Sequence, residues 1–260
     1  MKQHLLKNTY AAIVALFIAM MALPTTAQAQ TKYALEICGT WVTSDNCDDL
    51  SVIPGVSGRA SYDPDNKTLT LEDAKLNKGD YGIWSNIDGL TIKVSGTNEL
   101  NAKISAAAVY APTTITGGGT LNAESEKGCG IYAPSKNLTI RNCIVNAEGK
   151  YGIVGYNGSK GKLRISKATV TAEGEEGSIC DFKEITLEDC AITRPAGAVV
   201  DKGAIRLNGE KVTSEVRIEP IVTNYDLIIA GHRVTSANCY DLTVIPGVSG
   251  RASYDPDNKT

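Results

Sequence analysis

Histidine is almost missing from this sequence of 260 residues, which contains only His4 and His232. A Ser-His-Asp triad, a histidine-ligated metal ion and a histidine proton shuttle all need an imidazole side chain. The stretch between residues 30 and 224 holds none. The histidine-dependent classes of enzyme are therefore excluded from that stretch, and no glycine-rich phosphate loop precedes a predicted helix there.

Long runs of like charge are also missing. The chain has 26 basic and 29 acidic side chains, and residues 1–29 hold two of the lysines and no acidic residue. Without residues 1–29, 24 basic side chains stand against 29 acidic ones, a net charge of −5. Nucleic acids attract clustered positive charge. We therefore expect no nucleic-acid partner.

Only one long apolar run is present. It extends from Ala11 to Leu23, follows two lysines and precedes the small-residue triplet Ala27-Gln28-Ala29. Its 13 residues are too few for a membrane anchor, because a helix that crosses a bilayer needs about 20. Residues 1–29 are therefore predicted to be a secretory signal peptide. The mature chain is expected outside the cytoplasm, secreted or at the cell surface, without a membrane span.

Residues 69–219 repeat one order of residue types every 20 to 25 residues, the mark of a solenoid. Each repeat has three short segments in which aliphatic and polar residues alternate, and this period of two predicts strands. The aliphatic residues that define the three columns are Leu71, Ile92, Ile115, Ile140, Ile165, Leu187 and Leu207, then Leu76, Leu100, Leu121, Val145, Val170 and Ile192, and then Ile83, Val109, Ile131, Ile153, Ile179 and Val199.

Three strands per repeat predict an all-β fold, a right-handed parallel β-helix of about seven coils over residues 69–219. Like positions would stack about 4.8 Å apart along the axis. The aliphatic side chains would fill the bore, and the residues between them would face solvent. A leucine-rich repeat has a similar period, but its Leu-x-x-Leu-x-Leu-x-x-Asn spacing is absent.

Residues 33–68 and 225–260 are two copies of one module, and their last sixteen residues, IPGVSGRASYDPDNKT, are identical. Each copy predicts two short strands around a glycine and then the start of a β-hairpin at an Asp-Pro-Asp-Asn turn. The first hairpin runs directly into the solenoid. We therefore predict that residues 30–68 form a β-hairpin capping module over its open end. Residues 220–260 would start a second, truncated repeat unit, as expected for a fragment of a longer tandem protein.

Seven cysteines in an exported chain raise the expectation of disulfides. The predicted register argues against most of them, because Cys143 and Cys190 would lie two coils, or about 9.6 Å, apart. Cys129, Cys143, Cys180 and Cys190 are interpreted mainly as small buried thiols. Cys38 and Cys47 are close enough in sequence to pair within the first module.

Carboxylates are the remaining source of catalytic chemistry. Asp181 and Asp201 would share a column on neighbouring coils about 5 Å apart, the separation in a retaining glycosidase. Lys183 and Lys202 nearby fit a surface salt-bridge cluster equally well. Because no other acidic or arginine cluster converges on the two aspartates, no catalytic residue and no enzymatic activity is predicted.

Carboxylates in the first module raise the possibility of a calcium site, because calcium prefers oxygen ligands. Two of the three acids at Asp45, Asp48 and Asp49 are replaced in the second module. Turn geometry is sufficient to explain Asp63, Asp65 and Asn66. No metal site is therefore predicted. A stripe formed by Glu124, Glu148 and Glu173 is interpreted as a solvated edge.

Two outward-facing files are candidates for ligand binding. Trp84, Tyr110 and Tyr132 each follow an inward aliphatic residue, and a row of exposed rings suits stacking on sugar faces. Packing against the cap or under a loop is the structural alternative. Asn101 and Asn122 belong to a predicted asparagine ladder that also contains Asn77 and Asn146. Stacked amides hydrogen-bond to each other, and they also offer donors and acceptors to sugar hydroxyls.

Two motifs carry a resemblance to a known family. They are Tyr-Asp-Leu-x-x-x-Gly-x-x-Val-Thr-Ser-x-Asn at residues 225–238 and Ser-Tyr-Asp-Pro-x-x-x-Thr-Leu-Thr-Leu at residues 61–71. With the signal peptide and the repeats, the chain resembles exported carbohydrate-binding-domain proteins of gut bacteria, of the Bacteroidetes and Firmicutes type. The resemblance covers nearly the whole mature chain. It implies a non-catalytic polysaccharide-binding protein, with calcium left open as a cofactor.

Three functions remain in competition. The first is glycan binding at the rings and asparagines, which the family resemblance favours. The second is a structural spacer or adhesin repeat, and the third is a polysaccharide lyase or hydrolase.

Overall fold

The computed structural model describes residues 29–260 apart from 135, 157–159, 237 and 257. The predicted signal peptide therefore lies outside the described residues, except for Ala29. The chain divides into two units, Met1–Thr31 and Lys32–Thr260, and every described strand lies in the second unit. The only described helices are two 3-10 turns, η1 (Leu50–Val52) and η2 (Leu242–Val244). The predicted all-β class is confirmed.

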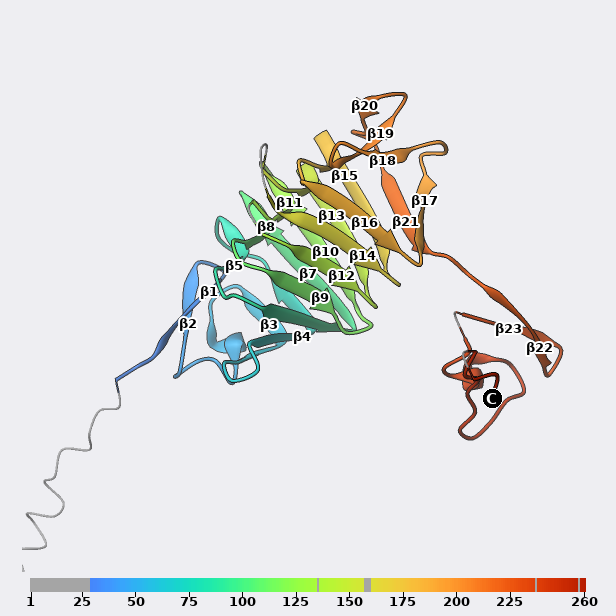
Figure 1. Ribbon diagram of the computed structural model, residues 1–260. Coiled ribbons are helices and arrows are strands. Elements are labelled where there is room, and N and C mark those ends of the chain that lie inside the picture. Colours follow the sequence, from blue (N-terminus) through green and yellow to red (C-terminus); the bar gives the residue numbers. More distant parts are fainter. Residues whose placement is uncertain (1–28, 135, 157–159, 237, 257) are drawn as a thin grey trace, which may run out of the picture. The chain divides into compact units, whose positions relative to one another are not determined.

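A parallel β-solenoid of about five turns forms the centre of this unit. Its strands stack in three columns along one axis (Figure 1). The first column contains β4 (Thr68–Leu76), β6 (Leu90–Ser95), β9 (Thr113–Thr116), β12 (Leu138–Arg141), β14 (Lys162–Ser166) and β16 (Glu184–Glu188). The second contains the end of β4, then β7 (Thr97–Ala102), β10 (Thr120–Ser125), β13 (Ile144–Val154) and β15 (Thr169–Cys180). The third contains β5 (Tyr81–Ser85), β8 (Ser105–Val109) and β11 (Cys129–Tyr132), followed by the ends of β13 and β15.

The register of the first column agrees with the prediction from the second turn onward. Ile92, Ile115, Ile140, Ile165 and Leu187 pair in succession. In the first turn the strand is displaced by two residues, so that Leu69 pairs with Ile92 and Leu71 pairs with Val94. A displacement by two preserves the face of every side chain, because side chains alternate with a period of two.

The second column contains a similar displacement with a polar consequence. Leu100 pairs with Ala123, and Asn98 occupies the position opposite Leu121. Asn98 is fully buried in the bore. Its Oδ1 accepts a hydrogen bond from the Ala74 N–H at 2.9 Å, and its Nδ2 donates to the carbonyls of Ser95 and Thr120. These bonds offset the cost of burying an amide.

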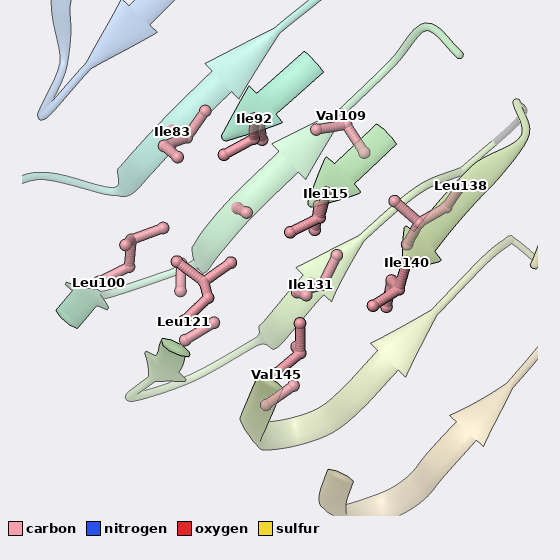
Figure 2. Packing of buried hydrophobic residues seen from close by; sticks show 14 of the residues in the cluster. Ile83, Ile92, Leu100, Val109, Ile115, Leu121, Ile131, Leu138, Ile140 and Val145 are labelled. Atoms are coloured by element: carbon pink, nitrogen blue, oxygen red, sulfur yellow. The ribbon is translucent and has the colours of Figure 1, made fainter. Parts of the chain in front are cut away.

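The bore is filled with aliphatic side chains from all three columns. Figure 2 shows Ile92, Ile115 and Ile140 facing Leu121, Val145 and Ile131 across the enclosed space. All six are at most 1 % exposed. Burying each such side chain contributes roughly 1.5 to 3 kcal/mol. This core holds the outer faces of the strands, and with them any ligand-binding residues, in fixed positions.

The module before the solenoid pairs with its first turn through two antiparallel contacts. Strands β1 (Lys32–Ile37) and β2 (Thr40–Thr43) form a hairpin, and β1 also pairs with β5. Strand β3 (Val56–Asp63) pairs with β4 along most of its length. At Gly58 the two backbones approach so closely that a Cβ atom would lie 2.2 Å from the Asp73 carbonyl oxygen. Glycine is therefore required at this position for packing as well as for its positive φ of 77°.

The last part of the predicted β-helix differs from the prediction. Strand β21 (Val216–Pro220) runs antiparallel between β15 and β17 (Cys190–Arg194), so β17 does not stack on β15. Strands β18 (Val199–Asp201), β19 (Ala204–Leu207) and β20 (Glu210–Lys211) form a separate antiparallel sheet. The segments that follow β16 therefore form antiparallel pairs where further coils were predicted, and the solenoid has about five turns where seven were predicted.

The second module has its own small core and repeats the internal bonds of the first. It contains β22 (Asn224–Ile229), β23 (His232–Thr235) and η2. The Thr235 N–H donates to Asn238 Oδ1 as the Thr43 N–H does to Asn46 Oδ1. Asp241 caps η2 as Asp49 caps η1. The local sequence is sufficient to form this part of the module in both places.

Candidate functional site

The three predicted rings lie in one row, and the first module adds a fourth. Ring centroids are 5.6 Å apart from Trp41 to Trp84, 5.7 Å from Trp84 to Tyr110 and 5.9 Å from Tyr110 to Tyr132. We call these four residues the aromatic row. It extends from β2 of the first module across the third column to β11. Trp41 was not predicted as a site residue, because only strand pairing across the module boundary brings it to the solenoid.

The register that produces the aromatic row is not the predicted one. Ile83 and Ile131 both pair with Ala107, whereas Val109 was predicted to lie between them and instead pairs with Ser85. Ala108 therefore lies between Trp84 and Tyr132 in the column, and Tyr110 follows the end of β8. The Tyr110 N–H donates to the Ser85 carbonyl at 2.8 Å, which fixes the backbone beside Trp84.

The rings pack against one another and remain half-buried. Trp41 meets Trp84 edge-on at 74°, and Tyr110 meets Tyr132 edge-on at 88°. Such edge-to-face contacts are favourable in themselves. The row is therefore a stepped surface of edges and faces and not the flat strip that sequence alone suggested.

The electrostatic surroundings of the aromatic row are uneven. The Lys32 ammonium lies 3.4 Å from the centroid of the Trp41 ring, a cation–π contact at the module end. Burial raises the pKa of the Tyr110 and Tyr132 hydroxyls above the ordinary value. Both phenols are therefore neutral near pH 7 and offer a hydroxyl donor and acceptor at the solenoid end.

The predicted asparagine ladder is present as two separate pairs. Asn101 Nδ2 donates to Asn77 Oδ1 at 2.9 Å, and Asn146 Nδ2 donates to Asn122 Oδ1 at 2.8 Å. The displacement between β7 and β10 places Asn101 opposite Glu124, so Asn101 and Asn122 are not neighbours. The amides bond to each other, as the structural interpretation requires.

The two aspartates that were weighed as a catalytic pair do not lie on neighbouring coils. Asp181 follows β15 and forms an ion pair with Lys211 at 2.8 Å. Asp201 ends β18, which belongs to the separate hairpin sheet, and its carboxylate lies 3.8 Å from Arg206. The expectation that they share a column on neighbouring coils was wrong, because the chain leaves the solenoid between them.

The candidate calcium carboxylates are engaged in local hydrogen bonds. Asp49 Oδ1 accepts from the Ser51 N–H, and Asp63 accepts from the backbone of Asp65 and Asn66. Hydrogen bonds from the side chain and then the backbone of Ser51 lower the pKa of the Asp49 carboxyl, and those from the side chain and backbone of Asn66 lower the pKa of the Asp63 carboxyl. Among the residues that the structure describes, no group of three histidine, cysteine or acidic side chains is arranged to hold a metal ion. Turn hydrogen bonds therefore account for Asp49 and Asp63.

The acidic stripe is in the predicted place. Glu124, Glu148 and Glu173 pair in register and are exposed. They line a surface hollow together with Lys127 and Lys150. The neighbouring lysines moderate the repulsion between stacked carboxylates, so a solvated edge explains the stripe.

All seven cysteines are free thiols. Burial raises the pKa of Cys143 to about 12 and that of Cys129 to about 11, so neither is a reactive thiolate near neutral pH. The alternative in which Cys38 bonds to Cys47 is not seen, and both lie buried in the first module.

Comparison of the chain with protein-family models, with curated proteins and with solved structures finds no match. The resemblance to carbohydrate-binding-domain proteins stays a prediction. In the described part of the chain, no helix is long and apolar enough to cross a membrane.

Proposed function

We propose that this is an exported, non-catalytic glycan-binding protein and that the aromatic row is its binding surface. The observation that carries the proposal is four aromatic rings in succession with centroid spacings of 5.6 to 5.9 Å. This spacing is close to the length of one sugar unit in an extended polysaccharide. A chain that lies along the solenoid axis would meet a ring edge or face at each successive sugar.

Weak affinity is expected from such a site. By analogy with aromatic pairs, each ring contact contributes roughly 0.5 to 1.5 kcal/mol. The stepped arrangement favours a chain with a twist over a flat ribbon, because successive rings are inclined by 40° to 88°. Useful binding would come from several copies acting together, through a raised effective concentration.

The test is calorimetry and insoluble-polysaccharide pull-down with a panel of plant and host glycans. Trp84→Ala combined with Tyr110→Ala should abolish binding. Tyr240→Ala removes an exposed ring outside the aromatic row, with 66 % of the residue accessible, and should leave binding unchanged. Binding that survives the double substitution would assign the glycan to another surface, with the two asparagine pairs next in line.

The first module is proposed to cap the solenoid. Strands β1 and β3 pair antiparallel with β5 and β4, so they supply hydrogen-bond partners to both strands of the first turn. An uncovered solenoid end exposes unpaired backbone and invites association with other chains. Removal of residues 30–60 should give a self-associating protein, which size-exclusion chromatography detects. An equally stable monomer would contradict the cap.

A structural spacer in an adhesin is the second candidate, and one observation favours it. The rings of the aromatic row contact each other across the boundary between β2 and β5, so they also fasten the module to the solenoid. If the protein is a spacer, the rings should still stabilise the folded chain, and no glycan in the panel should bind. For both candidate functions we propose that the protein is secreted or lies at the cell surface. We also propose that the coils of the solenoid are right-handed.

A further inference from the structure

The second module contains a partly buried apolar surface whose counterpart in the first module is buried. In the second module Leu227, Ile229, Ala252 and Tyr254 are only partly buried. Their counterparts Leu35, Ile37, Ala60 and Tyr62 are at most 5 % exposed. We call the four residues of the second module its docking face. The rest of its apolar core, which includes Val234 and Leu242, is buried within the module itself.

In the first module the counterparts of the docking face are covered by the first solenoid turn. Ala60 pairs with Leu71, and Tyr62 pairs with Leu69 on β4. Ile37 pairs with Ile83 on β5. Strands β3 and β4 lie side by side in Figure 1. The partner that buries this surface is therefore the two first-turn strands β4 and β5, which present the inward aliphatic residues Leu69, Leu71 and Ile83.

The backbone of the second module is already shaped for the same contact. Gly250 has a φ of 83°, close to the 77° of Gly58, its counterpart. At Gly58 the space beside the α-carbon holds the backbone of Asp73 and Ala74, whereas at Gly250 nothing lies within 4 Å. The start of the hairpin is also formed, because Asp255 and Thr260 exchange backbone hydrogen bonds as expected for a turn that leads into a strand.

We infer that the docking face of the second module binds the first turn of a further β-solenoid of this type, with the same pairing as β3 with β4 and β1 with β5. The inference rests on the capping role proposed for the first module and is independent of glycan binding. The partner is a strand pair with the pattern of residues 69–85, joined directly to the hairpin turn. Docking would bury two apolar side chains on each module strand and satisfy the backbone of residues 248–255.

The test extends the full chain after Thr260 with a second copy of residues 69–223. Hydrogen exchange is measured by mass spectrometry, with isotope labelling from Asn224 onward to separate peptides of identical sequence by mass. We expect backbone amides of residues 248–255 to exchange about a hundred-fold more slowly, or slower still, than in the unextended chain. The added solenoid should be protected as well.

Ala252→Asp is the matched control. In the unextended chain it changes a partly buried position, so it should lower the melting temperature only slightly and leave the exchange of residues 248–255 as fast as before. In the extended chain it should remove the new protection, and Ala60→Asp should likewise remove the protection of β3 and β4 at the first module. The inference is overturned if the added copy is protected while residues 248–255 exchange as before. It is also overturned if the added copy of residues 69–223 stays unprotected. These residues form a solenoid when they follow the first module, so their failure to do so after the second module would show that it offers no such docking face. Failure of Ala60→Asp to expose the first turn would instead contradict the capping role.

Discussion

The same sixteen residues adopt different secondary structure in the first module, at 53–68, and in the second module, at 245–260. Residues 56–63 form strand β3, whereas their copies at 248–255 form no strand. The turn that follows this segment is the same in both copies, since Asp63 and Asp255 each accept hydrogen bonds from the asparagine three residues later. The difference is the partner strand. Strand β4 pairs with β3, whereas no described strand pairs with residues 248–255. Strand formation here depends on a neighbour and not on the segment itself.

The two modules also show which of their contacts are internal. The Tyr33–Tyr62 ring contact is preserved between Tyr225 and Tyr254, at 5.3 and 5.6 Å. Trp41 is replaced by Arg233, so the aromatic row has no counterpart in the second module. Contacts within the module are therefore kept, and a contact that reaches the solenoid is lost. The module behaves as a local fold with one surface specialised for a partner.

Hydrogen exchange should show the largest difference between the modules. Peptides 50–63 and 242–255 differ in mass because Ser51 is replaced by Thr243. Amides of β3 should open only with the solenoid, with a free energy near that of global unfolding, whereas those of residues 248–255 should open at close to zero cost. Equal protection in the two peptides would mean that the segment forms its strand without a partner.

A buried charge should separate the modules next. Leu35→Asp places a carboxylate at a fully buried position, with an expected cost of about 4 kcal/mol or more. Leu227→Asp changes the half-exposed counterpart and should cost about 1 kcal/mol or less. Urea unfolding followed by tryptophan fluorescence measures the first effect directly, because both tryptophans belong to the aromatic row. Similar losses at the two positions would show that the second module is covered as fully as the first.

Alanine at the two paired glycines should isolate the close approach of β4. Both Gly58 and Gly250 have positive φ, so alanine at either position costs about 1 kcal/mol from the backbone. Only at Gly58 does the new methyl group also meet a backbone oxygen, which adds roughly 1 to 3 kcal/mol. Chemical denaturation of the two variants measures the difference. If the two losses are equal, β4 does not press on the module.

Exchange of the ring and the guanidinium between the modules should have the smallest effect. Trp41→Arg removes the edge-to-face contact with Trp84, with an expected loss of about 0.5 to 1.5 kcal/mol. Arg233→Trp should change stability by about 0.5 kcal/mol or less, because it removes only an exposed ion pair with Asp226 at 3.8 Å. The first variant should also weaken glycan binding, which calorimetry detects. An unaltered affinity would restrict the site to the three solenoid rings.

The sequence carried enough information for the solenoid and for the inward positions. Ile92, Ile115 and Ile140 stack as predicted because one buried face strongly constrains the register. Displacements by two residues at Leu71, Leu100 and Val109 were missed, because they preserve every face and leave no mark on the alternating pattern. The rings were found from the same alternation. Trp41 was missed because it lies on an antiparallel strand of the first module, outside the repeats in which the alternation was followed.

What the sequence alone determined is local: the alternating strands, the Asp-Pro-Asp-Asn turns, the capped 3-10 turns and the small core that both modules share. These depend on residues a few positions apart, so they recur wherever the sequence recurs. The tertiary structure decided the rest. It selected which aliphatic residues stack, brought Trp41 to Trp84, put Asp201 in an antiparallel sheet outside the solenoid and made β3 a strand. Each of these requires backbone hydrogen bonds or apolar burial supplied by a distant segment, and identical residues without that partner do not form them.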